Sequence, residues 1–102
     1  MAYLLQVDFP FEGPFGEEME KAFLDLAKSI NEEDGFHWKI WTENQETQEA
    51  GGIYVFEEKQ DAEKYAEMHK NRLQASGVKD IRVRIFHINE KLTKLNRGYS
   101  KY

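Results

Sequence analysis

GFHWKIWTE (35–43), followed after a polar turn by AGGIYVF (50–56), is the stretch that decides the fold. Each half is a short run rich in aromatic and β-branched residues and bounded by turn residues, which predicts two strands joined by a loop. Period-two alternation places Phe36, Trp38 and Ile40 on one face and Trp41, beside Lys39, on the other. Large rings on both faces indicate that both faces are covered, since a one-sided sheet normally carries charges outside. We expect a second copy of the chain to cover one face.

The hairpin contains two adjacent glycines, Gly51 and Gly52. Folding it about Glu46 predicts these cross-strand pairs: Trp38 with Tyr54, Phe36 with Phe56, Trp41 with Gly51, and Ile40 with Gly52. Glycines inside a strand leave room for indole rings or for a ligand. The alternative is a bulge that bends the hairpin. Both interpretations stay open at this point.

Length, charge and cysteine content limit which kinds of protein this chain can be. The 102 residues predict one domain, 1–102, and the formal charge of −5 argues against nucleic acid or a membrane surface as a partner. The chain has no cysteine, so no disulfide or thiolate metal site is expected. Asp8 interrupts the N-terminal apolar run too early for a signal peptide, and no run reaches transmembrane length. These features predict a soluble, cytoplasmic protein.

The order of elements follows from hydrophobic periodicity. Strands are expected at Tyr3–Phe9, within 35–56 and at Ile81–Asn89, with helices over 17–30 and Glu58–Ser76. The resulting βαββαβ order predicts an α+β fold of ferredoxin-like type with a four-stranded antiparallel sheet. The tail 97–102 is expected to be flexible.

His69 is the polar member of an otherwise apolar helical stripe. Its companions on the second helix are Ala62, Tyr65, Ala66 and Leu73. An imidazole in such a stripe is often a satisfied core histidine, but it can also be a functional group that titrates near neutral pH. The stripe alone does not decide between these roles.

The sequence lacks the patterns that mark several common kinds of functional site. The histidines His37, His69 and His87 do not have metal-ligand spacing, no serine lies in a nucleophile elbow, and Gly13-Pro14-Phe15-Gly16 does not match a dinucleotide-binding loop. No metal, flavin, NAD or other cofactor is therefore expected. RNA binding is a rival on topology, since Gly-Gly-Ile-Tyr-Val-Phe resembles a base-stacking strand, but Glu49 and Ala50 stand where a basic residue is needed.

An apolar pocket between the sheet and the helices remains. Tryptophan, tyrosine and phenylalanine rings would surround it, and His69 with Gln6 or Asp8 would give it polarity. Such a pocket suits a flat aromatic ligand. The alternative is that the rings simply fill the core.

With these segments in place, the chain resembles the YdhR family of proposed monooxygenases, small relatives of the antibiotic-biosynthesis monooxygenases. The resemblance rests on these segments: Gly13-Pro14-Phe15-Gly16, Ser29-Ile30-Asn31, Gly35-Phe36, Trp38-Lys39, Trp41-Thr42-Glu43, Ala50-Gly51-Gly52-Ile53-Tyr54, His69, Arg72-Leu73 and Asn89-Glu90. It spans nearly the whole chain and ends at Asn96.

The resemblance implies a dimeric α/β barrel, in which two sheets pack face to face and each subunit keeps its own pocket. It also implies cofactor-independent oxygenation of electron-rich phenols by O2. Other members of the superfamily degrade haem with an Asn, a Trp and a His. This chain departs from that trio, since Gln6 or Asp8 stands where the Asn is expected and the second helix does not begin with a tryptophan. Haem degradation is not expected.

From these considerations we expect His69, Trp38 and Tyr54 to carry the chemistry. His69 would be a general base or a hydrogen-bond partner for a substrate hydroxyl, while Trp38 and Tyr54 hold the substrate ring, with Trp41 as a substitute if the strand faces the other way. The residues expected to contact substrate are Gln6, Phe36, Trp41, Phe56 and Tyr65. The competing hypothesis is a homodimeric protein that binds a small molecule without catalysis.

Overall fold

The structure is a computed structural model that describes residues 2–98. Its elements are β1 (Tyr3–Pro10), α1 (Gly16–Ala22), α2 (Leu24–Ile30), β2 (Phe36–Asn44), β3 (Glu49–Phe56), α3 (Lys59–Ala75), β4 (Arg82–His87) and α4 (Glu90–Leu95). The four strands form one sheet in the order β2-β3-β1-β4, and all neighbours are antiparallel. The predicted ferredoxin-like α+β fold is confirmed. Residues 99–102, the greater part of the predicted flexible tail, lie outside the described residues.

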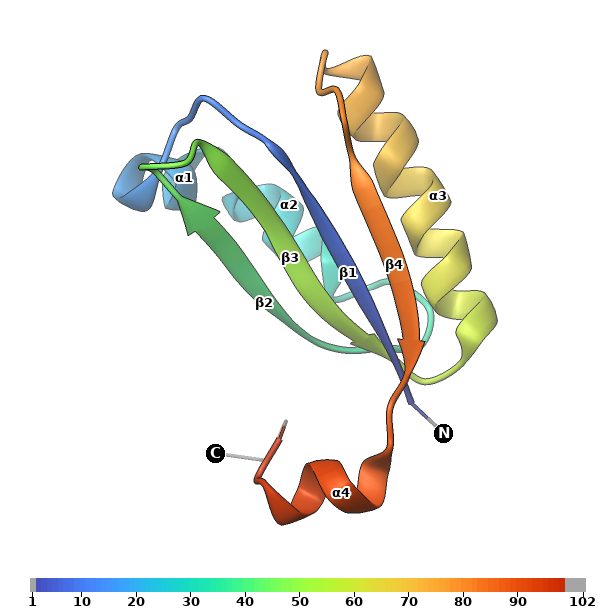
Figure 1. The fold of residues 1–102 in the computed structure, drawn as a ribbon. Coiled ribbons are helices and arrows are strands. Elements are labelled where there is room, and N and C mark those ends of the chain that lie inside the picture. The colour runs from blue at the N-terminus through green and yellow to red at the C-terminus, as the bar shows by residue number, and fades with distance from the viewer. Residues whose placement is uncertain (1, 99–102) are drawn as a thin grey trace.

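The helices cover only one face of the sheet. Figure 1 shows α1, α2 and α3 behind the four strands, with α4 beyond the end of β4. The covered face carries Leu5, Val7 and Phe9 of β1, which are buried, while Gln6 and Asp8 alternate with them and point to the open face. The core therefore lies between the covered face and the helices.

The hairpin register differs from the predicted one by one residue. Phe36 pairs with Phe56 as predicted, but a bulge follows it, and Trp38 pairs with Val55 instead of Tyr54. Lys39 takes the place opposite Tyr54, and Trp41 lies opposite Gly52. One extra residue moves every later side chain to the other face. Phe36 therefore shares the covered face with Trp41, and Trp38 lies on the open face, so the predicted grouping of Phe36 with Trp38 was wrong.

The first helix is interrupted at Phe23. The predicted single helix over 17–30 is divided into α1 and α2, because Phe23 adopts φ −110° and ψ 14°. In this position its ring stacks on Trp41, with 6.1 Å between centroids, and packs beside Phe11 at 6.2 Å. Helical periodicity does not predict this break, because packing of the Phe23 ring against the sheet is a tertiary contact.

The second long helix agrees with its prediction. α3 buries Ala62, Tyr65, Ala66 and His69 against the sheet, and Leu73 packs at the edge of the same core. After β4, the chain forms α4, which the sequence analysis did not predict and which is capped by the Asn89 side chain accepting a hydrogen bond from Leu92 N at 3.1 Å. Over residues 2–98, no helix combines the length and the apolar character needed to cross a membrane.

Candidate functional site

A small cavity of about 60 Å³ lies between the covered face of the sheet and the helices. Its walls come from β1, β2, β3, α1, α2, α3 and the break at Phe23, so the complete fold is needed to build it. The residues that line it are Phe9, Phe11, Met19, Phe23, Leu26, Lys39, Trp41, Ala50, Gly51, Tyr54, His69 and Leu73. Most are apolar or aromatic, and His69 and Lys39 supply nitrogen atoms. No carboxylate is among them.

His69 is held in one orientation by α3. Only 5% of its surface is exposed, its ring stacks on Tyr65 with 5.3 Å between centroids, and its Nδ1 lies 2.8 Å from Nη2 of Arg72. Because a guanidinium can only donate, Nδ1 must accept this hydrogen bond, and the neutral ring carries its hydrogen on Nε2. No residue within 2–98 accepts a hydrogen bond from Nε2. His69 therefore presents a free N–H donor.

The surroundings also keep His69 uncharged. Burial lowers the pKa of His69 to about 3, and the positive charges of Arg72 and Lys39 act in the same direction. A neutral imidazole whose Nδ1 is already occupied is a hydrogen-bond donor. Of the two roles considered from the sequence, general base or hydrogen-bond partner, this geometry favours the second.

Arg72 makes hydrogen bonds to both His69 and Tyr65 behind the cavity. Its Nη2 donates to Nδ1 of His69 and, at 3.2 Å, to the hydroxyl oxygen of Tyr65. Its Nε is buried without a hydrogen-bond partner, and no carboxylate within residues 2–98 pairs with it. A partly buried guanidinium is normally paired with an anion. This one places uncompensated positive charge beside the cavity.

Lys39 is the site residue that the sequence analysis missed. Its Nζ lies 3.2 Å from the centre of the Trp41 ring and 4.5 Å from the centre of the Tyr54 ring. Burial lowers the pKa of Lys39 to about 7, and the charge of Arg72 adds to the shift. Strand alternation had already placed Lys39 beside Trp41. What the sequence did not reveal was that this face turns inward.

Gly52 makes room for the Lys39 side chain. A Cβ at Gly52 would lie 2.6 Å from Cε of Lys39 and 3.1 Å from Cε1 of Tyr54. A Cβ at Gly51 would instead collide with the backbone of β1, at the Val7 carbonyl oxygen and, 2.8 Å away, at Asp8 Cα. Both glycines lie where a side chain would not fit, but the space was predicted for an indole ring or a ligand. The space is occupied by a lysine and by a neighbouring strand, and the bulge lies in β2.

Three of the predicted site residues meet at the cavity: His69, Tyr54 and Trp41. Burial raises the pKa of Tyr54, and the neighbouring Tyr65 adds to the shift, so Tyr54 stays neutral. Phe56 and Tyr65 are fully buried beside Tyr54, with ring centroids 6.2 Å and 5.0 Å from it. They support the wall and do not line the cavity.

A second cavity of about 330 Å³ lies at the edge of β2, against α2. It is lined by Ala27, Lys28, Ile30, Asn31, Phe36, His37, Trp38, Lys39 and Trp41. Lys39 and Trp41 line both cavities, so they lie between them. Phe36 and Trp38 belong to this outer space. Trp38, on the open face, also packs against the cluster of Ala2, Val55 and Ile88.

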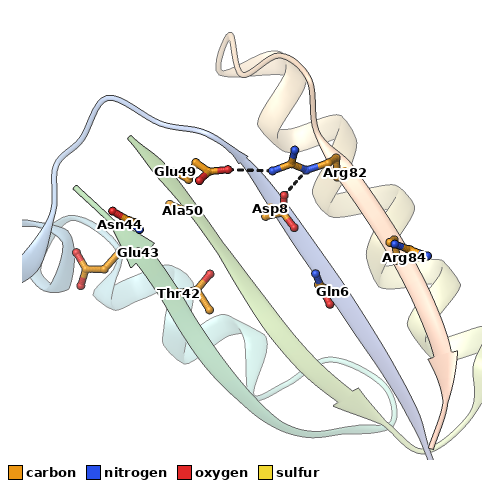
Figure 2. Close-up of a pocket in the computed structure, with 9 residues that line it drawn as sticks. All are labelled: Gln6, Asp8, Thr42, Glu43, Asn44, Glu49, Ala50, Arg82 and Arg84. Carbon is orange, nitrogen blue, oxygen red and sulfur yellow. Dashed lines mark hydrogen bonds and ion pairs between the residues drawn. The ribbon is translucent and has the colours of Figure 1, made fainter. Parts of the chain in front are cut away.

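Gln6 lies away from His69, on the open face of the sheet. It lines a polar hollow of about 450 Å³ together with Asp8, Thr42, Glu43, Asn44, Glu49, Ala50, Arg82 and Arg84. Figure 2 shows Arg82 between Asp8 and Glu49, with ion pairs to both. The predicted meeting of Gln6 or Asp8 with His69 was wrong, because strand alternation sends them to opposite faces of the sheet.

Comparison with known proteins identifies the family. No curated protein matches the chain. A family model described as "Putative mono-oxygenase ydhR" matches residues 4–99, which is nearly the whole chain. The chain therefore belongs to the ydhR family, as its sequence segments had indicated.

Proposed function

We propose that the protein is a cofactor-independent monooxygenase that acts on a phenolic aromatic compound in the cavity between the sheet and the helices. Membership of the ydhR family supports monooxygenase activity in general. The observation that carries the substrate class is the unpartnered Nε2–H of His69 in a cavity lined by Trp41 and Tyr54. A flat ring with one oxygen substituent fits this cavity. The aromatic walls would contact the faces of the ring, and the imidazole would donate a hydrogen bond to its oxygen.

The empty cavity is smaller than a substrate ring requires. Ligand sites usually enclose at least ~300 Å³, whereas the inner cavity measures about 60 Å³. Lys39 covers the face of Trp41, and the outer cavity of about 330 Å³ adjoins the same two residues. We infer that the substrate enters from the edge of β2 and replaces the Lys39 amine on the Trp41 ring. Trp41, rather than Trp38, then holds the substrate.

The proposed reaction balances without a cofactor. A phenol that loses its hydroxyl proton becomes electron-rich enough to reduce O2 itself. One oxygen atom becomes a new carbonyl of the quinone product, and the other leaves as water, so the substrate supplies all the electrons. In this scheme His69 Nε2–H stabilises the oxyanion by a hydrogen bond, and the closed aromatic walls exclude water.

Oxygen-electrode measurements test this proposal. Metal-free and flavin-free protein is mixed with a panel of phenols and quinols, and O2 uptake is compared with a thermal-shift screen of the same compounds. We expect uptake with a stabilising compound, and a loss of about 100-fold in His69→Ala, the typical cost of removing one oxyanion donor. The control is His87→Ala, because His87 is exposed on β4.

Two results would contradict the proposal. Stabilisation by phenols without any O2 uptake would favour the non-catalytic binding protein. Uptake that is equal in His69→Ala and His87→Ala would remove His69 from the mechanism.

We also propose a homodimer formed through the open face. The open face carries Ile40, 52% exposed, and Phe86, 43% exposed, which a second sheet would bury. Sedimentation equilibrium should give a dimer, and Ile40→Glu with Phe86→Glu should give a monomer. Leu24→Glu is the matched control, because Leu24 is also 52% exposed but lies on α2. A monomeric parent protein would overturn the proposed homodimer.

A cytoplasmic location stays a prediction from the sequence.

A further inference from the structure

Lys39 is half-buried and its amine lies among aromatic rings. Its neighbours are aromatic, its Nζ contacts Trp41 and Tyr54, and Gly52 leaves the space that its Cε occupies. Lysine side chains normally extend their ammonium group into water and bury only their methylenes. In this protein Lys39 lines the inner cavity, and its nitrogen lies against the rings of two other lining residues, Trp41 and Tyr54.

The groups that face Lys39 are neutral or positive. From α3 they are His69 and Arg72, from β3 Tyr54, and at the outer cavity Lys28 and His37. No acidic side chain lines either cavity within residues 2–98. Two cationic residues, Lys39 and Arg72, thus share one apolar region without a counter-ion. A site of this composition lacks one component, a negative charge, and a bound anion would supply it.

A cation–π contact alone does not account for this arrangement. Such a contact offsets only part of the cost of transferring a lone ammonium from water into a protein interior. The amine avoids part of this cost by giving up its proton, since burial lowers the pKa of Lys39 to about 7. A lysine that is partly neutral at neutral pH can accept a proton.

We propose that Lys39 takes the hydroxyl proton of the substrate, and that the cavity holds its ligand as the anion of an acidic phenol. This inference rests on the proposed function, which it deepens by naming the base and the ionisation state of the substrate. The O–H bond of the phenol breaks, the neutral amine forms a new N–H bond, and no electron is transferred. The ammonium and the His69 Nε2–H then both face the oxyanion.

The roles of His69 and Lys39 are therefore distinct. His69 cannot take the proton in the tautomer that Arg72 imposes, because Nδ1 accepts a hydrogen bond from Arg72 and the ring hydrogen is then on Nε2. Lys39 has no such constraint, since its Nζ lies against the ring faces of Trp41 and Tyr54. Arg72 acts as a positioning residue that holds the imidazole and raises the local positive potential.

Absorbance titration with p-nitrophenol tests the inference without any turnover, because only the anion of this phenol is yellow. On binding to the parent protein near neutral pH, the yellow fraction should increase. Lys39→Met should weaken binding of the anion at least tenfold, or ~1.4 kcal/mol, a modest value for loss of a buried charge partner. The control Lys70→Met removes a lysine of the same charge that is exposed and adjacent to His69, and it should bind within twofold of the parent.

Two further probes keep the inference falsifiable if Lys39→Met does not fold. p-Nitroanisole has the same ring but no ionisable hydroxyl, and it should bind the parent protein at least tenfold more weakly. Lys39→Arg keeps the charge but cannot give up a proton, so it should bind the preformed anion yet lose activity with a phenol that is neutral at the assay pH.

Equal binding of p-nitrophenol and p-nitroanisole, or a colourless bound phenol, would overturn the inference. So would full anion affinity in folded Lys39→Met, or no binding of either probe. The proposed function fails separately. Ionisation of bound phenols without O2 uptake would refute the oxygenase and leave the role of Lys39 standing, whereas full O2 uptake in Lys39→Met would do the opposite.

Discussion

The two faces of the sheet differ in whether their positively charged side chains are paired with carboxylates. On the open face, Arg82 is exposed and paired with Asp8 and Glu49. On the covered face, Lys39 and Arg72 lie among aromatic rings, and no carboxylate within residues 2–98 pairs with either. Exposed ion pairs contribute little and are common on any surface. Partly buried positive charge without a partner is costly, so it is the covered face that indicates a ligand site.

The largest expected effect distinguishes the two glycines of β3. Gly51→Ala should destabilise the protein by about 3 kcal/mol, because the new methyl group meets the backbone of β1, which cannot move away cheaply. Gly52→Ala should cost only ~1 kcal/mol, because it meets the end of the flexible Lys39 side chain. Urea denaturation measures both. Equal losses would show that Gly52 does more than accommodate Lys39.

The next effect concerns Lys39 and pH. The pKa of Lys39 falls from its ordinary value of 10.5 to about 7 in the folded protein, so the unfolded chain binds more protons between these values. The penalty is full below about pH 7 and disappears as pH rises toward 10.5. Lys39→Met should therefore be more stable than the parent near pH 7 by a few kcal/mol, and this advantage should shrink toward pH 10. Thermal unfolding across this range measures it.

A constant difference between Lys39→Met and the parent at all pH values would contradict this account of Lys39. Lys70→Met provides the baseline, since Lys70 is exposed on the same helix as His69.

A smaller effect is expected at Arg72. Arg72→Met removes the donor to Nδ1 and a nearby positive charge, so the pKa of His69 should rise from about 3. The rise should be partial, because burial is the larger cause of the shift. NMR titration of the imidazole protons measures it. An unchanged pKa of His69 would show that Arg72 does not influence the imidazole electrostatically.

The smallest effect is expected on the open face. Arg82→Ala breaks the ion pairs with Asp8 and Glu49, but all three groups can be hydrated, so the loss of stability should be slight and should diminish further in high salt. Urea denaturation at two salt concentrations checks this. A large, salt-independent loss would remove the distinction between the two faces.

Local periodicity predicted the order of the four strands, the long helix α3 and its burial through Tyr65 and His69, because it depends only on spacing along the chain. The family followed from the resemblance of particular segments, and the family model confirms it. Which rings form the cavity depends instead on tertiary packing. One bulged residue after Phe36 exchanged the roles of Trp38 and Trp41, and it turned Lys39 inward.

The meeting of Lys39, His69 and Arg72 was likewise decided in three dimensions. Each residue belongs to a regular element, but β2 and α3 are far apart in sequence and meet only across the core. Periodicity assigns a side chain to a face of its own element. It does not determine whether a strand contains an extra residue, because packing against the rest of the molecule decides which face turns inward.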